Sequence, residues 1–185
     1  MEGKEPPRIY AIGHSTRPIH EFIALLKQNG IKQLVDIRTV PRSRFNPQHE
    51  QGALRGSLEN AGIHYVYLKE LGGLSPKVKD SINTGWRVES FRNYADYMQT
   101  DAFAAAIDTL INLAEDFPSA IMCAEAAPWR CHRSLVADAL VIRRVKVLDI
   151  ISEREPEEHH LTDFALAREG RITYPQTGQL SYTKK

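Results

Sequence analysis

Short, nearly continuous apolar segments alternate along the chain with amphipathic segments. The apolar segments are rich in β-branched residues and are bounded by glycine or polar residues, which is typical of buried strands. We predict strands at residues 8–13, 33–37, 64–68, 119–124 and 145–151. In the segments between them, apolar residues recur at helical spacing, and several of these segments end at a glycine. We predict helices at residues 18–28, 53–62, 88–99, 101–115 and 131–143.

This alternation predicts a parallel sheet that is covered by helices on both faces. We therefore expect one α/β domain over residues 1–185, Rossmann-like and three-layered, with a mainly parallel five-stranded sheet. Its core should span residues 8–151, and a polar C-terminal extension, 152–185, should carry one short helix near residues 161–169. We prefer the strand order 3-2-1-4-5 to the flavodoxin-like order 2-1-3-4-5, because only the first places strand one between strands two and four.

One long segment, residues 69–86, has neither helical nor strand periodicity. It contains three glycines and one proline. A structureless loop of this length within a compact domain is usually functional or mobile. We expect a loop with a role at the functional site, and whether it closes as a lid stays open.

Length, composition and charge narrow the class of protein. A chain of 185 residues that is 42% hydrophobic can bury a sizeable core. The formal net charge of +1 argues against a globally basic nucleic-acid binder, although a local basic patch is compatible with it. Residues 1–8 are polar and lack the apolar core of a signal peptide, and no apolar run approaches the roughly 20 residues of a membrane span. We expect a cytoplasmic protein with no membrane partner, of undetermined oligomeric state, whose two cysteines are free thiols.

Three polar motifs follow the predicted strands one, two and four. They are GHST at 13–16, DIRTVPRSRFNP at 36–47 and CAEAAPWRCHRS at 123–134. In open α/β sheets, ligands bind beyond the carboxyl ends of the strands. We therefore expect the three motifs to line one crevice.

Arginines are concentrated in two of these motifs. Guanidinium groups match the geometry of phosphate and carboxylate, and a helix that begins near Cys131 would add N–H donors. Any one of these arginines could instead pair with a surface carboxylate, but the cluster as a whole predicts an anion site, most simply for a phosphate group. The expected binding residues are Ser15, Arg38, Arg42, Ser43, Arg44, Arg130 and Arg133.

The same motifs hold candidate catalytic groups. His14 or His132 could transfer protons, and Glu125 or Asp36 could activate water or stabilise positive charge on a sugar. Glu125 is expected on the same face of strand four as Cys123. The thiolate of Cys131 is favoured at a helix start beside arginines. The predicted catalytic set is Glu125, His14, Asp36, Cys131 and His132.

Spacing argues against several known sites. A tyrosine-phosphatase loop that starts at Cys123 would need an arginine at position 129, and Arg130 is one residue late. The glycines and Lys-Ser/Thr pair of a P-loop are missing from the sequence. The spacing of Cys123, Cys131 and His132 is irregular for structural zinc, so we expect no cofactor. A transition metal on these three residues stays open as an alternative, with Glu125 or His14 able to complete the set.

Several segments together resemble the DUF488 family of uncharacterised bacterial and archaeal proteins. They are AIGHST, LVDIRTVPRSRFNP, HYVYLKELGG, YADYM, IMCAEAAPWRCHRSLVADAL and ITYP, and they extend over about residues 9–175. The resemblance implies a Rossmann-like α/β domain and one shared site, without implying a reaction. The motif positions that it implies are Gly13, His14, Ser15, Asp36, Arg38, Pro41, Ser43, Cys123, Glu125, Cys131, His132 and Arg133.

These observations favour an enzyme that acts on a phosphate-bearing substrate, a nucleotide or nucleic acid, by hydrolysis or glycosidic cleavage. Two alternatives stay open. One is a non-catalytic module that binds a nucleotide or nucleic acid. The other is a thiol or metal protein built on the two cysteines and His132.

Overall fold

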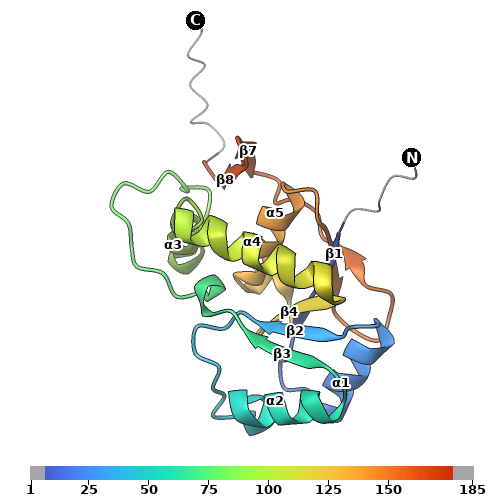
Figure 1. Ribbon diagram of the computed structural model, residues 1–185. Coiled ribbons are helices and arrows are strands. Elements are labelled where there is room, and N and C mark those ends of the chain that lie inside the picture. Colours follow the sequence, from blue (N-terminus) through green and yellow to red (C-terminus); the bar gives the residue numbers. More distant parts are fainter. Residues whose placement is uncertain (1–6, 177–185) are drawn as a thin grey trace, which may run out of the picture.

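A six-stranded sheet forms the centre of the computed structural model, which describes residues 7–176 (Figure 1). Its strands are β1 (Arg8–Gly13), β2 (Gln33–Asp36), β3 (His64–Tyr67), β4 (Ser119–Cys123), β5 (Lys146–Ile150) and β6 (Glu157–Glu158). The helices are α1 (Ile19–Gln28), α2 (Gln51–Asn60), α3 (Glu89–Tyr97), α4 (Asp101–Asp116) and α5 (Arg133–Val141). Single 3₁₀ turns are η1 (Pro47–His49), η2 (Lys69–Leu71) and η3 (Pro128–Arg130). The α/β class and the mainly parallel sheet are confirmed.

The strand order is β3-β2-β4-β1-β5-β6, with only β6 antiparallel to its neighbour. The predicted order 3-2-1-4-5 is wrong in its middle, because β4 lies between β2 and β1, and the sheet has six strands rather than five. Ile121 of β4 lies opposite both Val35 of β2 and Ala11 of β1. β4 is buried along its whole length, whereas β1 begins at the exposed Arg8, so the more apolar strand occupies the more central position. The ends of β1, β2 and β4 still lie side by side.

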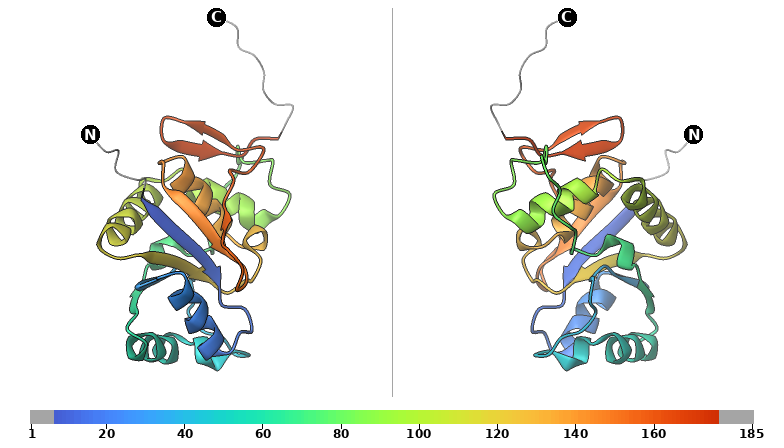
Figure 2. Two further views of the ribbon diagram at one scale, coloured as in Figure 1. Left: turned by 90° about the vertical axis from the view of Figure 1, so that its right-hand side faces the viewer. Right: turned by 90° about the vertical axis from the view of Figure 1, so that its left-hand side faces the viewer.

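Helices cover the sheet on both faces (Figure 1), and the two turned views in Figure 2 show the same layers. One apolar cluster contains Phe22 and Leu26 of α1 and Leu54 of α2. The other contains residues of α3, α4 and α5, among them Tyr94 and Leu135. Burying each such side chain contributes about 1.5–3 kcal/mol, so the two clusters are the main stabilising element of the fold. No helix in the described part of the chain is long and apolar enough to cross a membrane.

The C-terminal extension packs against the domain instead of forming the predicted helix near residues 161–169. It forms a hairpin of β7 (Leu166–Arg168) and β8 (Arg171–Thr173). Glu169 and Gly170 join the strands with φ of +51° and +76°, the backbone that a tight two-residue hairpin turn requires. Tyr174 after the hairpin is completely buried in the core. The remainder of the predicted extension, 177–185, lies outside the described residues, and the predicted loop 69–86 contains η2 but no longer element.

Asp138 of α5 joins this extension to the domain. Its carboxylate has no exposed surface, and it accepts hydrogen bonds from His159 Nε2 (2.9 Å), Thr162 Oγ1 (2.7 Å), the Thr162 amide (3.1 Å) and the Tyr174 hydroxyl (2.8 Å). The other ring nitrogen of His159 lies 3.2 Å from Asp149 Oδ2. With a carboxylate at each ring nitrogen, His159 is held as the doubly protonated cation.

The alkaline side of the pH–stability profile is expected to depend on His159. Burial opposes its protonation, but the hydrogen bonds to Asp138 and Asp149 outweigh burial and raise its pKa from 6.5 to about 9. The unfolded chain therefore loses this proton at lower pH than the folded protein. The stabilisation that protonated His159 gives to the folded state is complete below pH 6.5 and is lost as the pH rises through about 9. Urea midpoints measured across this range should fall with pH, and His159→Gln should flatten the fall; an equally steep fall in that variant would contradict the assignment.

Candidate functional site

A cavity of about 390 Å³ lies beyond the carboxyl ends of β2 and β4. Its walls come from the loop after β2, the 69–86 loop, the start of α3 and the segment between β4 and α5. The lining residues are Arg38, Thr39, Val40, Arg42, Gly73, Leu74, Ser90, Phe91, Cys123, Ala124, Glu125, Arg130, Cys131 and His132. Two of the three motifs predicted from the sequence thus line one cavity.

A buried ion pair supports one wall of this cavity. Arg38 donates from Nε and Nη2 to the two carboxylate oxygens of Asp36, at 2.9 and 2.6 Å. Tyr65 donates its hydroxyl to Asp36 at 2.7 Å, and Asp36 has no exposed surface. Both oxygens of Asp36 are therefore engaged, and the carboxylate orients Arg38 instead of facing the cavity.

His14 belongs to the same buried network. Its Nδ1–H donates to the Ser15 carbonyl at 2.8 Å, and its Nε2 accepts from Arg38 Nη1 at 3.3 Å. Its ring also stacks on His49, with 4.3 Å between the ring centroids. Burial lowers the pKa of His14 to about 4. The imidazole is therefore neutral near pH 7. It contacts Arg38 but does not line the cavity.

The turn after β4 is held from two sides. A Cβ on Gly13, at the end of β1, would lie 1.8 Å from the Glu125 carbonyl oxygen, so only glycine permits this contact. Arg133 is almost completely buried and donates to the carbonyls of Glu125 (3.0 Å) and Ala126 (3.2 Å). The Arg133 guanidinium thus positions the turn. Because β4 ends at Cys123, Glu125 lies in this turn instead of on the strand. Glu125 is exposed and lines the cavity.

Arg42 and Arg130 are the exposed cations of the cavity. Neither has a carboxylate partner among residues 7–176. Ser15, Ser43 and Arg44, the other predicted binding residues besides Arg38 and Arg133, do not line the cavity. The structure therefore brings two solvent-facing guanidinium groups to the same cavity as the Glu125 carboxylate.

Cys123 and Cys131 form a disulfide, unlike the two free thiols expected from the sequence. The turn η3 reverses the chain between them and returns Cys131 to the end of β4. Their Cα atoms are 7.6 Å apart, and both residues are buried, with 3% and 4% of their surface exposed. In this oxidised form Cys131 has no thiolate, so its predicted role as a nucleophile requires the reduced protein.

The ring of His132 lies next to the disulfide. Its Nε2 lies 3.1 Å from the Ile37 carbonyl, which can only accept, so Nε2 carries the proton and Nδ1 keeps a lone pair. Nδ1 lies 3.6 Å from Cys131 Sγ. Burial lowers the pKa of His132 to about 4, which keeps the ring neutral. The ligand atoms of Cys123, Cys131 and His132 all lie within 4.8 Å of one another, which makes them a potential metal-binding group in the described part of the chain.

The apolar wall of the cavity was not predicted from the sequence. It consists of Val40, Leu74 and Phe91, which lie in three segments that are distant along the chain. Leu74 lies in the 69–86 loop, whose length was the only signal in the sequence for this wall. His49, which stacks on His14, was also missed.

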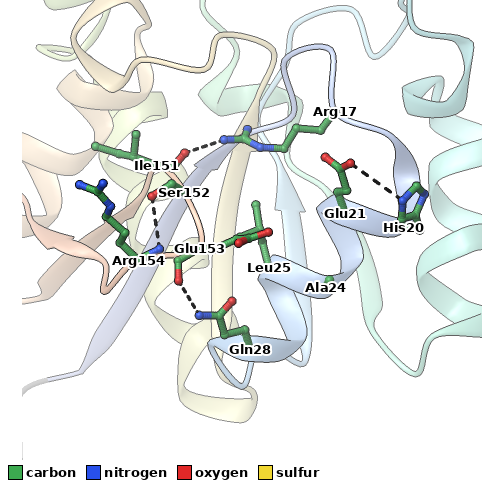
Figure 3. Close-up of a pocket in the computed structure, with 10 residues that line it drawn as sticks. All are labelled: Arg17, His20, Glu21, Ala24, Leu25, Gln28, Ile151, Ser152, Glu153 and Arg154. Atoms are coloured by element: carbon green, nitrogen blue, oxygen red, sulfur yellow. Dashed lines mark hydrogen bonds and ion pairs between the residues drawn. The ribbon is translucent and has the colours of Figure 1, made fainter.

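A larger cavity of about 700 Å³ lies between α1 and residues 151–154 (Figure 3). Its side chains carry mixed charge. As Figure 3 shows, Arg17 reaches the Ile151 carbonyl, at 2.6 Å, and it also donates to the Gly13 carbonyl. One of the two arginines that line this cavity is therefore engaged by backbone oxygens, and none of the predicted site residues lines it.

Comparison with known protein families gives a match. A family model described as "Domain of unknown function DUF488" matches residues 18–140, which include the motifs at 36–47 and 123–134. No curated protein and no solved structure matches the chain.

Proposed function

The chain belongs to the DUF488 family, and from the geometry of its cavity we propose that it is an enzyme that cleaves a phosphate-bearing substrate, a nucleotide or nucleic acid. The reaction class is hydrolysis or cleavage of a glycosidic bond. One observation carries the proposal: Arg42 and Arg130, which lack carboxylate partners in the described residues, share a cavity with Glu125.

The two arginines suit a phosphate group. A guanidinium presents a planar fork of N–H donors that matches phosphate oxygens, and it stays charged at all relevant pH values. Arg42 and Arg130 come from the loops after β2 and β4, so a phosphate between them would contact both walls. Arg38 extends this positive surface from the cavity wall, although most of its donors are engaged by Asp36, His49 and His14.

The apolar wall suits a ring attached to that phosphate. Val40 and Leu74 are 56% and 76% exposed, although both are large apolar residues. Together with Phe91 they offer a surface on which a base could stack and lose its contact with water. Phosphate-binding cations beside such a surface favour a nucleotide over inorganic phosphate or a phosphorylated sugar.

Glu125 is the group best placed for the chemical step. Asp36 and His14 are engaged in the buried network, whereas no cation in residues 7–176 lies within 4.0 Å of the Glu125 carboxylate, which lines the cavity. A carboxylate in this position can take a proton from an attacking water or stabilise positive charge on a sugar ring.

Changing Glu125→Gln is expected to lower turnover by about 10²–10⁴-fold while leaving substrate affinity within a few-fold, because the amide keeps the shape but cannot accept a proton. A library of nucleotides and short oligonucleotides would be incubated with the protein and the products separated by chromatography. Undiminished turnover by the glutamine variant would remove Glu125 from the mechanism.

Arg42→Ala supplies the binding arm of this experiment, and Arg168→Ala is its matched control. Arg168 is an exposed arginine of β7 that does not line the cavity. Loss of a phosphate contact should weaken binding by about tenfold or more in the first variant and not in the second. Binding that depends on Arg42 without any product would favour the non-catalytic module instead.

A further inference from the structure

We propose that Cys123, Cys131 and His132, with the disulfide reduced, form a three-ligand site for a zinc-type divalent ion in the wall of this cavity. The site goes beyond the proposed function, because an ion could bind there whatever the substrate is. These are the three residues for which the sequence left a transition-metal site open as an alternative.

The three donors have the chemistry and spacing of a zinc site. Two thiolates and an imidazole are ligands that borderline-soft ions such as Zn²⁺ prefer. Metal–ligand distances of about 2.3 Å for sulfur and 2.0–2.1 Å for nitrogen place tetrahedral sulfur and nitrogen ligands about 3.6 Å apart. Cys131 Sγ and His132 Nδ1 are 3.6 Å apart, and the three ligand atoms lie within 4.8 Å of one another.

His132 is already oriented as a ligand. Metal-binding histidines usually donate their other N–H to a carbonyl or carboxylate, which fixes the tautomer and the ring plane. His132 does this through Nε2 and the Ile37 carbonyl, at 3.1 Å, and its Nδ1 lies 3.6 Å from Cys131 Sγ. The 69–86 loop passes close to this nitrogen at Gly73, where a Cβ would lie 2.5 Å from Nδ1. Glycine at this position therefore leaves the space beside the ligand atom open.

The backbone separation of the cysteines also suits an intervening ion. Their Cα atoms are 7.6 Å apart, whereas disulfides usually join Cα atoms about 4.4–6.8 Å apart. An ion between two thiolates keeps the sulfur atoms well beyond bonding distance and so fits the wider spacing. Cys123 ends β4 and Cys131 lies just before α5. These two segments would not need to move closer together to bind the ion.

Metal binding requires reduction of the disulfide. A dithiol reductant gives two electrons and two protons to the S–S bond, which becomes two thiols while the reductant becomes a disulfide. Each thiol then releases one proton as it coordinates the ion. The oxidised form and the metal-bound form are therefore mutually exclusive states of the same two cysteines.

A fourth ligand would reach the ion from the cavity, because all three ligand residues line it. Three protein ligands with one open position are typical of catalytic zinc, whereas structural zinc has four. Cys123, Cys131 and His132 line the same cavity as Glu125, Arg42 and Arg130. A water or a substrate oxygen in the fourth position would thus face the groups of the proposed function.

The test is direct metal binding by the full chain, kept reduced and free of oxygen. Zn²⁺ is titrated in competition with a chromophoric chelator, and Co²⁺ is added separately as a spectroscopic probe. We expect one equivalent of Zn²⁺, together with sulfur-to-cobalt charge-transfer bands and the intense ligand-field bands of tetrahedral Co²⁺. Protein with the disulfide intact should bind neither ion.

Cys131→Ser and His132→Gln should each weaken Zn²⁺ binding by more than about 100-fold, since losing an outer-shell partner alone costs 10–100-fold. His20→Gln, at an exposed histidine of α1, is the matched control and should change nothing. Reduced wild-type protein that binds no Zn²⁺, or that gives an octahedral cobalt spectrum without sulfur bands, would overturn the proposal even if the variants fail to fold. Because no substrate is used, this result is independent of the test of the proposed function.

Discussion

Replacing Asp138 by alanine is expected to destabilise the protein by about 3–5 kcal/mol, because it leaves four buried or partly buried donors without their acceptor. The donors are His159 Nε2, the amide and hydroxyl of Thr162 and the Tyr174 hydroxyl. One of them belongs to a buried imidazolium, which keeps only Asp149 as a counter-charge. Urea unfolding near pH 7, followed by circular dichroism, measures the loss of unfolding free energy.

Asp108→Ala is the matched control for this substitution. Asp108 is a largely exposed residue of α4 whose partner Arg143 lies 4.0 Å away, so its loss should cost at most about 0.5 kcal/mol. Limited proteolysis adds a local measurement, since the Asp138 variant should be cleaved first between residues 152 and 176. A loss below about 1 kcal/mol, or unchanged protection of that segment, would show that packing alone holds the extension.

Arg38→Met is expected to cost a similar amount, about 3–5 kcal/mol, because it leaves the fully buried Asp36 carboxylate without a cation. Methionine keeps much of the arginine volume, so the loss comes mainly from the uncompensated charge. The double substitution Asp36→Leu with Arg38→Met should recover a large part of the stability, since a well-packed apolar pair can replace a buried ion pair. Unfolding free energies of the two single variants and the double variant complete the cycle.

An additive double variant would contradict this account, because it would mean that Arg38 and Asp36 contribute independently. The loss of stability expected at Arg38 also determines which arginine suits a binding test. A ligand that no longer binds to Arg38→Ala would report damage to the buried network as much as a lost contact. Arg42, which is exposed and has no ion-pair partner in the described residues, reports on the ligand alone.

The elements of the sheet could be predicted because they are encoded locally. The apolar runs that predicted β1 and β4 lie within one residue of the observed strands, and Thr100 caps α4 through the Phe103 amide. The sequence could not show that β4, and not β1, lies next to β2. That position depends on which strand is buried more completely against partners distant in sequence. The β7–β8 hairpin was missed because its short strands have helix-like composition and are determined by the turn at Glu169–Gly170.

The sequence predicted which loops meet beyond the sheet, but not how their side chains are paired. The motifs after β2 and β4 meet at one cavity, which follows from parallel topology. Sequence could not show that Asp36 and Arg133 direct their charges into the protein, because their partners are a side chain two residues away in one case and backbone carbonyls in the other. The pairing of Cys123 with Cys131 depends on the reversal at η3, which the sequence did not reveal.

The position of β1 in the sheet has a consequence for synthesis of the chain. In the described residues β1 pairs with β4 and β5, and Ile9 of β1 lies opposite Ser119 and Val147, which follow it by 110 and 138 positions. By contrast, β2 and β3 pair with each other over a short separation. At about 5–20 residues per second, the ribosome needs several seconds or longer to deliver β4 after β1 has emerged. During that interval an apolar strand has no hydrogen-bonding neighbour and is open to association with other nascent chains. β1 precedes both of its partners along the chain and is therefore among the last strands to enter the sheet.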